Sequence, residues 1–298
     1  MKNYFDEIIS RFPVRRTGKE KEKFSEYAKN TAESLGYEAK LETLSKNTNV
    51  VIGAPDEARV IFTAHYDTPA KSLLPNLMMP KCRVLTYLFA MILPLILAFL
   101  SIIVSDLIAS ALSIEELWAP IYLVLYFGVF YLSMLCFKNK NNYNDNTSGV
   151  AAVFEIMARE ENKNKGYAYI LFDNEEKGLL GSKAHVKAHP VSNKTLVINL
   201  DCVGYGDEFL FIATPDAQED ADYKRFSESK NEEKNLHFFS TKECMYNSDN
   251  KRFKRSVGVC ACKGSRLVKF YTPRIHTGYD TVVDKANIEF LSQALSQL

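Results

Sequence analysis

The stretch RVIFTAHYDTP, residues 59–69, changes from an apolar, β-branched run to a polar segment that contains His65 and Asp67. The apolar run predicts a strand over residues 59–63, and the two polar side chains follow where that strand ends. In open α/β sheets, ligands bind beyond the carboxyl ends of the strands. The stretch therefore indicates an α/β fold with a functional site at one edge of its sheet. Alone it is weak evidence, because a loop histidine beside a capping aspartate has the same pattern.

Further along the chain, short apolar runs predict more strands, and amphipathic segments predict helices. The predicted strands cover residues 49–52, 167–172, 195–200 and 209–213. Helices are predicted within residues 1–46 and over residues 148–159 and 178–189, whereas the charged stretch 216–234 resembles a solvated helix or loop. Strands that alternate with helices favour a three-layer α/β/α sandwich around a mixed, largely parallel sheet.

The overall composition bounds the partners and the cellular location. Lys and Arg number 37 and Asp and Glu 36, so no net field favours nucleic acid, and we expect no nucleic-acid partner. Residues 1–30 contain no continuous apolar run of the length that a secretory signal needs, so we expect the amino terminus in the cytoplasm. The oligomeric state does not follow from the sequence.

The six cysteines are far apart in the chain, which predicts mostly free thiols. They are Cys82, Cys136, Cys202, Cys244, Cys260 and Cys262. Cys260 and Cys262 lack a second Cys or His pair at zinc-finger spacing. Two small buried residues of a strand are the simpler interpretation of this pair.

Two long apolar segments interrupt the α/β pattern. Residues 84–104 and 117–137 each contain 21 residues without a charge. In a helix this length spans about 31 Å, close to the hydrocarbon core of a bilayer. The connector between them carries only acidic charges, and basic residues flank the outer ends, at Lys81, Arg83, Lys138 and Lys140. The positive-inside rule then places both ends in the cytoplasm.

We therefore expect a multi-pass protein of the cell membrane. A transmembrane hairpin, residues 84–137, would be inserted into a discontinuous α/β domain made of residues 1–83 and 138–298, which would lie on the cytoplasmic side. The lipid bilayer would contact the two apolar segments, 84–104 and 117–137. A pair of buried helices in a soluble domain, or an apolar dimerisation arm, is the alternative.

Polar residues with metal-binding chemistry follow the other predicted strands too. Asp145 stands before the helix in NDNTSGV, Glu175 and Glu176 follow YAYILF, Asp201 follows LVINL, and His276 lies in PRIHTGYDT. Some have ordinary alternatives, such as a helix cap for Asp145. Adjacent buried carboxylates are costly unless a cation offsets their charge. With His65, these residues form a set of nitrogen and oxygen ligands of the kind that zinc binds.

The series HYD, DNTSG, NEE, INLD and IHT resembles the co-catalytic dizinc exopeptidases related to bacterial leucyl aminopeptidase, aminopeptidase Y, glutamate carboxypeptidase II and glutaminyl cyclase. Outside the apolar hairpin, the resemblance runs from about residue 49 to the end of the chain. It implies an α/β/α exopeptidase fold and two zinc ions, or other divalent metals in their place. It also implies a peptide substrate and, most directly, hydrolysis of amino-terminal peptide bonds.

The resemblance implies a role for each matching residue. His65 and Asp201 would bind one zinc ion, Glu176 and His276 the other, and Asp145 would bridge the two. Asp67 would orient the imidazole of His65 from behind the metal. Glu175 would remain free of the metals and act as the general base.

The segment MYNSDNKRFKR, residues 245–255, resembles the Ser-Asp-His-x-x-Phe stretch that lines the substrate pocket in this family. Ser248, Asp249 and Phe253 match, but Asn250 stands where histidine often occurs, and four basic residues make the segment unusually cationic. Such a segment could receive a substrate carboxylate or touch anionic lipid headgroups.

Three histidines fall outside these motifs. His185 and His189 are four residues apart but lack the glutamate of an HExxH motif, so we expect them at the surface. His237 has no partner pattern nearby.

Other functions of the same scaffold stay open. Glutaminyl cyclases resemble one another in having pocket tryptophans, one of them next to the carboxy-terminal histidine, whereas here Trp118 is the only tryptophan and Ile275 precedes His276. A carboxypeptidase or dipeptidase would use the basic residues of 251–255. The complete ligand set and Glu175 argue against the interpretation as a non-catalytic membrane scaffold. Because the hairpin lies between His65 and Asp145, we expect the active site close to the cytoplasmic face of the membrane.

Overall fold

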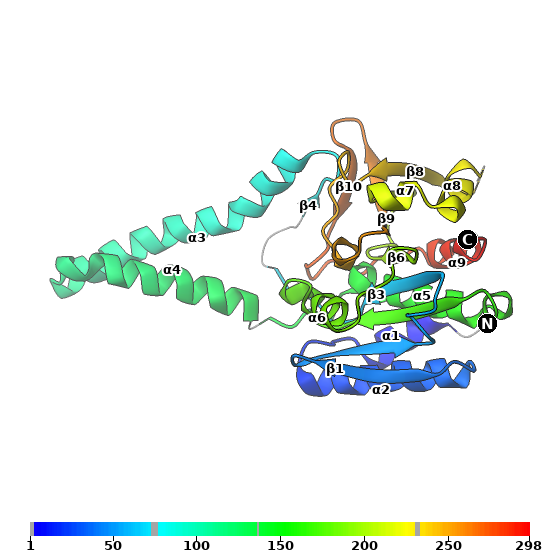
Figure 1. Cartoon of the computed structure of the whole chain (residues 1–298). Helices are drawn as coiled ribbons and strands as arrows, with labels where there is room; N and C mark the ends of the chain where they lie inside the picture. The colour runs from blue at the N-terminus through cyan, green and yellow to red at the C-terminus, as the bar shows by residue number, and fades with distance from the viewer. Residues whose placement is uncertain (1–2, 73–76, 136, 230–232) are drawn as a thin grey trace.

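A computed structural model describes residues 3–72, 77–135, 137–229 and 233–298 (Figure 1). Its strands form one ten-stranded sheet. They are β1 (Ala39–Leu44), β2 (Asn47–Ile52), β3 (Val60–His65), β4 (Leu77–Met78), β5 (Tyr167–Phe172), β6 (Leu196–Leu200), β7 (Glu208–Ala213), β8 (Asn235–Ser240), β9 (Ser256–Ser265) and β10 (Lys269–Pro273). The order is β1-β2-β5-β3-β6-β9-β10-β4, with β7 also beside β9 and β8 beside β7.

The centre of the sheet is parallel. β3 pairs in parallel with both β5 and β6, and β6 pairs in parallel with β9. Antiparallel pairs flank this centre, namely β1 with β2, β2 with β5, and β7 with β9. The carboxyl ends of β5, β3 and β6 therefore meet at one edge, and the predicted mixed α/β sheet is confirmed.

Helices cover both faces of the sheet. α1 (Tyr4–Arg11), α2 (Gly18–Ser34), α5 (Gly149–Ala158), α8 (Ala221–Glu228) and α9 (Lys285–Leu295) contribute to the core on one face, and α6 (Leu180–Ala188) packs on the other. Shorter elements are η2 (Tyr143–Ser148), η3 (Glu160–Asn162), η4 (Glu175–Lys177), α7 (Pro215–Gln218) and η5 (Asp249–Arg252).

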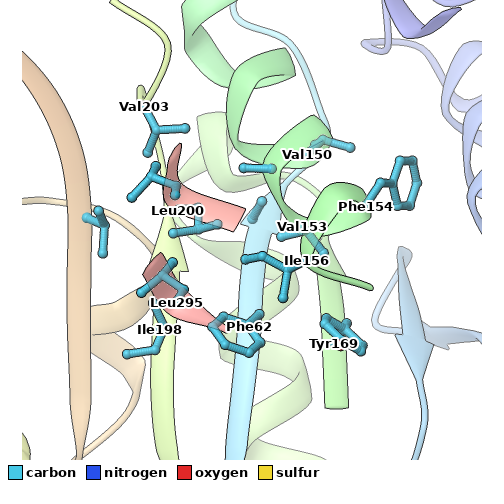
Figure 2. Close-up of a cluster of buried hydrophobic side chains, with 14 of the residues drawn as sticks. Phe62, Val150, Val153, Phe154, Ile156, Tyr169, Ile198, Leu200, Val203 and Leu295 are labelled. Carbon is cyan, nitrogen blue, oxygen red and sulfur yellow. The ribbon is translucent and has the colours of Figure 1, made fainter. Parts of the chain in front are cut away.

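The apolar runs of the central strands are explained by burial on both faces. In β5, Tyr169 and Leu171 belong to the larger core cluster, and Ile170 and Phe172 belong to the cluster on the opposite face. Alternate residues of a strand point to opposite faces, so a strand covered on both sides is apolar throughout. Figure 2 shows the larger cluster, in which residues of α5, including Val153 and Ile156, pack over β3, β5 and β6.

One predicted helix is wrong at its carboxyl end. Residues 39–44 form strand β1 and do not continue the helix predicted within residues 1–46. β1 pairs with β2 through a two-residue turn in which Ser45 and Lys46 have positive φ angles of 49° and 69°. Asn-Gly and Asp-Gly are the strong signals for such turns, so Ser-Lys gave little indication of a hairpin.

The charged stretch predicted as a solvated helix or loop is only partly solvated. It contains α8, whose Tyr223 and Phe226 are buried in the larger core cluster. Its residues 230–232 lie outside the described part of the chain.

The apolar hairpin consists of α3 (Arg83–Leu112) and α4 (Trp118–Leu135), joined by η1 (Glu115–Leu117). Both helices project away from the α/β body (Figure 1). Segments of α3 and of η1–α4 are long and apolar enough to cross a membrane, with mean hydropathies of 2.7 and 1.2, and only 11% and 0% of these windows are buried. The hairpin is therefore not a pair of core helices within this chain.

The cysteines agree with the sequence-based expectation. The five described ones are all free thiols, and Cys136 lies outside the described residues. Cys260 and Cys262 are both buried in β9, as expected for small strand residues.

Candidate metal centre

The predicted ligand residues meet at the shared carboxyl edge of β3, β5 and β6. His65 is the last residue of β3 and lies opposite Phe172 of β5. Glu175 and Glu176 follow three and four residues after β5 ends, and Asp201 immediately follows β6. The parallel register of these strands brings segments that are far apart in the sequence to one edge.

Asp145 lies between two histidines. Its Oδ1 is 3.3 Å from Nε2 of His65, and its Oδ2 is 2.9 Å from Nε2 of His276. The same nitrogen of His65 is 3.6 Å from Oδ1 of Asp201, and that of His276 is 3.5 Å from Oε2 of Glu176. The side chains thus divide into two pairs, His65 with Asp201 and His276 with Glu176, and one carboxylate of Asp145 faces both pairs.

Asp67 fixes the loop that carries the two glutamates. Its Oδ1 accepts a hydrogen bond from the backbone N–H of Glu175 at 3.0 Å, and its Oδ2 accepts one from that of Glu176 at 3.3 Å. Nδ1 of His65 lies 3.6 Å from the same carboxylate and 3.2 Å from the Asp67 carbonyl oxygen. Asp67 is therefore placed to orient the imidazole and the glutamate turn together.

Carboxyl groups outnumber the cationic side chains at this edge of the sheet, and the pKa values of the buried groups are shifted as a result. Burial raises the pKa of Glu176 to about 8, although the charge of His276 opposes the shift. Burial also raises the pKa of Glu175 well above its usual value, with His65 opposing and Glu176 adding repulsion. Burial opposes protonation of His276, yet the carboxylates of Glu176 and Asp145 raise its pKa above the usual value.

Two residues that the sequence reasoning missed hold the Asp145 loop. The carboxylate of Asp280 accepts hydrogen bonds from the backbone N–H groups of Asn144 at 2.9 Å and Asp145 at 3.0 Å. The side-chain amide of Asn146 donates to the carbonyl oxygen of Leu200 at 2.9 Å, and its oxygen accepts from the N–H of Cys202 at 3.2 Å. Both residues stand within the motifs, so their positions next to the predicted ligands were the available signal.

Arg15 is a third missed residue, and it is fully buried behind the site. Its guanidinium donates to the carbonyl oxygen of Tyr66 at 2.5 Å and to the hydroxyl of Thr147 at 2.9 Å. It thereby joins the His65–Asp67 loop to the loop that contains Asp145. Burial lowers the pKa of Arg15 to about 10, and the nearby carboxylates oppose that shift, so the side chain stays charged at neutral pH.

The backbone is unusual at three loops of this edge. Asn174, Cys202 and His276 have positive φ angles of 54°, 59° and 59°. Non-glycine residues seldom adopt such angles, and they persist where surrounding contacts fix the chain. Each of these residues is a predicted ligand or lies within two positions of one.

The predicted pocket residues are buried beside the site. Ser248 and Asp249 are fully buried, and Phe253 is 6% exposed. Ser248 accepts a hydrogen bond from the side-chain amide of Asn199 at 2.9 Å, which ties this segment to β6. Burial raises the pKa of Asp249 to about 7, with His65 opposing. Asp249 thus lies within electrostatic reach of the site, whereas Phe253 packs against Phe172 in the core.

The expectation that His185 is a surface histidine is wrong. His185 is 2% exposed, and its Nδ1 lies 2.6 Å from Oε2 of Glu42. His189 is 40% exposed and contacts the other oxygen of Glu42 at 2.9 Å. Glu42 belongs to β1, the strand that was predicted as helix, so this partnership was not visible. His237 also has a partner, Glu208, at 2.6 Å.

The donor set fits divalent metal ions. Five carboxyl groups, of Asp67, Asp145, Glu175, Glu176 and Asp201, lie around two imidazoles and one permanently charged group, Arg15. Within the described part of the chain, the buried atoms Glu176 Oε1 and Asp201 Oδ1 have no hydrogen-bond partner. Ligand atoms of His65, Asp145 and Glu176 all lie within 4.8 Å of one another, as do those of Asp145, Asp201 and Cys202. A bound cation would satisfy these oxygens and offset their charge.

Comparison with known proteins identifies the family of the chain. The family model described as peptidase family M28 matches residues 137–296, more than half of the chain. The chain belongs to peptidase family M28. This match confirms the family resemblance of the sequence motifs, and the fold and family are those of metallopeptidase-type enzymes. No curated protein matches the chain by sequence.

Solved structures share the fold. Glutaminyl cyclase from Porphyromonas gingivalis aligns with a TM-score of 0.60 at 13% identity, over 99% of this chain and 94% of its own. A Zn-dependent exopeptidase from Parabacteroides distasonis aligns with a TM-score of 0.58 at 14% identity, over 99% and 94%. The LapA aminopeptidase of Legionella pneumophila aligns with a TM-score of 0.58 at 13% identity, over 99% and 68%. Solved proteins with this fold thus include both peptidases and a glutaminyl cyclase.

Proposed function

We propose that this M28 protein is a dizinc aminopeptidase that removes amino-terminal residues from peptides. The observation that supports it most directly is the position of Asp145, whose two oxygens face His65 and His276 at 3.3 and 2.9 Å. A carboxylate between two separate ligand pairs is the arrangement expected where one group bridges two ions. His65 and Asp201 would hold one zinc ion, and Glu176 and His276 the other.

The chemistry of the site follows from its own residues. When bound, two zinc ions would supply Lewis acidity that lowers the pKa of water and polarises a carbonyl group. Glu175 would take a proton from the attacking water and deliver it to the leaving amine. Burial raises the pKa of Glu175 above its usual value, which makes this carboxylate a stronger proton acceptor than an exposed glutamate. Asp67 would keep the Glu175 backbone and the His65 ring in place through the contacts described above.

Aminopeptidase activity is favoured over glutaminyl cyclisation by the residues near His276. Trp118, the only tryptophan, lies in helix α4 of the hairpin, and the buried Ile275 precedes His276. The fold alone does not separate the two reactions, since structures of both kinds align with the chain. A peptide that begins with glutamine separates them, because cyclisation would release ammonia and hydrolysis would release the first residue.

We propose further that α3 and α4 cross a cell membrane and that both ends of the hairpin face the cytoplasm. Large apolar side chains such as Val84, Leu107 and Val124 are 72%, 63% and 73% exposed, which a bilayer would cover. The acidic connector and the basic flanks support this orientation. The α/β domain would then present its site close to the inner membrane face. Moving that domain away with a long linker should impair cleavage of membrane-associated substrates, and an unchanged rate would contradict the proximity.

The decisive experiment pairs metal analysis with substrate choice. The purified full chain should contain two zinc ions and cleave free and carboxy-blocked peptides but not amino-blocked ones. Glu175→Gln should keep both metals and lose at least about a hundredfold in kcat, the range of a lost general base. Glu228→Gln, on the exposed surface of α8, is the matched control and should be fully active. Full activity of Glu175→Gln, or cleavage blocked only by carboxy-capping, would refute the proposal.

A further inference from the structure

Where the hairpin leaves the α/β body, the surface forms a hollow of about 500 Å³. It is lined by the residues that lead into α3 and by the turn after β8, namely Lys81, Cys82, Arg83, Val84, Leu85, Lys242 and Glu243. The turn is held to α3 because the guanidinium of Arg83 donates to the carbonyl oxygens of Thr241 at 3.0 Å and Lys242 at 3.3 Å. The hollow therefore belongs to the junction between the apolar hairpin and the domain.

The charges at this junction are almost all positive. We call Lys81, Arg83, Lys242 and Lys251 the basic junction. None of these four cations forms an ion pair with an acid in the part of the chain that the structure describes. The acidic residue of the hollow, Glu243, accepts hydrogen bonds from the backbone and hydroxyl of Ser240 and is attracted to Lys81 without forming an ion pair with it.

Two further contacts show how these cations are held. Nζ of Lys81 lies 3.6 Å from the ring centroid of Phe239, and Nζ of Lys251 donates to the side chain of Asn247 at 2.6 Å. Desolvation, and then repulsion from Arg83 and Arg252, lower the pKa of Lys251. Four cations gathered around one acidic side chain, Glu243, leave an excess of positive charge, and a bound anion would offset its repulsion.

The surface beside these cations is apolar. Directly after Arg83, Val84 is 72% exposed, and Tyr87 and Leu88 are 63% and 58% exposed. An anionic head could contact the basic junction while an attached hydrocarbon chain lies along the first turns of α3. A substrate carboxylate would meet the same cations but would leave this apolar strip uncovered.

We propose that the basic junction binds the phosphate headgroup of an anionic phospholipid, whose acyl chains lie against the start of α3. The inference rests on the membrane anchorage proposed above and adds lipid selectivity to it. Lys251 belongs to η5, the same turn as the buried pocket residue Asp249. A lipid at this junction would therefore lie next to the wall of the predicted substrate pocket.

The test uses the purified full chain in a neutral detergent, with dioleoyl phosphatidylglycerol or dioleoyl phosphatidylcholine added to the micelles. Phosphatidylglycerol should raise the melting temperature saturably, and phosphatidylcholine should not. Each basic residue near an anionic surface contributes about 1 kcal/mol, which is about fivefold in affinity. Lys242→Gln should thus require about fivefold more phosphatidylglycerol for the same shift, and the double variant K81Q/R83Q roughly 30-fold more.

The matched control, K187Q/K194Q, removes two exposed lysines. Lys187 is near the end of α6, and Lys194 lies two residues before β6; neither lines the hollow at the start of α3. This control should respond to phosphatidylglycerol like the unaltered chain. If Arg83 is needed for folding, Lys242→Gln still carries the test, because its side chain is exposed.

Four results would overturn the inference. The first is an equal rise in melting temperature with both lipids, and the second is an unchanged response of Lys242→Gln and K81Q/R83Q to phosphatidylglycerol. The third is a full rise in melting temperature with inorganic phosphate alone. The fourth is a KM defect of K81Q/R83Q that is confined to peptides with a free carboxylate. Flotation with phosphatidylcholine vesicles separates this inference from its premise. Failure to float refutes the membrane anchorage, whereas flotation without a preference for phosphatidylglycerol refutes only the lipid site.

Discussion

Replacing Arg15 with methionine tests whether a buried charge holds the two halves of the candidate metal centre together. The guanidinium is fully buried and makes four side-chain hydrogen bonds. They go to the carbonyl oxygens of Tyr66 and Phe12 and to the side chains of Asn142 and Thr147. Methionine fills a similar volume but leaves all four acceptors without this donor.

The expected loss of stability follows from these contacts. Each buried acceptor left without a partner costs about 1–3 kcal/mol. Relief from burying the guanidinium offsets part of that sum, and removal of one partner from a buried charged network typically costs about 3–5 kcal/mol in total. For a chain of this size, such a loss lowers the melting temperature by roughly 10 °C.

Thermal unfolding followed by circular dichroism in neutral detergent measures the effect. Arg225→Met is the matched control, because the Arg225 side chain is 77% exposed and pairs with Asp222 at the surface. It should cost less than about 1 kcal/mol. Arg15→Lys should fall between the two, since it keeps the charge but loses the planar fork of donors. If Arg15→Met melts within about 2 °C of the Arg225→Met control, buried charge does not organise the site and our reasoning fails.

Three further predictions test other parts of the fold and site. Gly149→Ala should destabilise the chain by about 1–3 kcal/mol, because its Cβ would lie 2.3 Å from the carbonyl oxygen of Leu200, whereas Gly18→Ala has open space and should be neutral in the same melting assay. Removing divalent metals with a chelator should lower the melting temperature and abolish peptidase activity, and added zinc should restore both; an unchanged melting curve would contradict a metal centre. Burial opposes ionisation of Glu20, yet hydrogen bonds from Lys138 and the start of α2 lower its pKa to about 2. Since this folded pKa lies below the unfolded one, the stabilisation is fully present above about pH 4.5 and is lost as the pH falls through about 2, so Glu20→Gln should be less stable than the unaltered chain at pH 7, and the difference should shrink steadily between pH 4.5 and pH 2.

The strands and the polar residues at their ends were predicted correctly because they depend on local sequence pattern. His65, Glu176 and Asp201 each end or follow an apolar run, and such a run predicts a strand whatever its partners are. Once the strands are placed in a parallel sheet, their polar ends must meet at one edge. The convergence of these side chains could therefore be expected without knowledge of any contact.

The sequence could not predict partnerships between distant segments. Arg15 contacts Asn142 and Thr147, which are 127 and 132 residues away, and nothing near Arg15 marks it as buried. His185 was misjudged for a related reason, because its partner Glu42 is 143 residues away on a strand mistaken for helix. Buried polar groups depend on the finished packing, and one wrong secondary-structure element removes their partners from view.

The inserted hairpin leaves the ligands close together because the two segments that connect it to the α/β domain, residues 70–72 and 137–138, are bonded to each other. The chain departs after Asp67 and returns before Asp145, and Ala70 and Lys138 form a β-bridge at that point. The N–H of Lys71 donates to the carbonyl oxygen of Phe137 at 2.8 Å. With its ends fixed in this way, the insertion costs the domain little, because closure entropy grows only with the logarithm of loop length.

The first of these connecting segments, residues 70–72, also contacts the candidate metal centre. The N–H of Ser72 donates to the carbonyl oxygen of His276 at 2.6 Å, beside the bridge between Ser72 and Thr277. A shift of the hairpin would therefore act on the loop that carries a predicted zinc ligand. If the helices are fixed in a bilayer, the His276 loop is held by the membrane-inserted segment as well as by its own domain. We therefore expect deletion of residues 84–137 to affect the site even when the α/β domain folds, because the hydrogen bond from Lys71 to Phe137 would be lost and the adjoining Ser72, which bonds to His276, would lose that support.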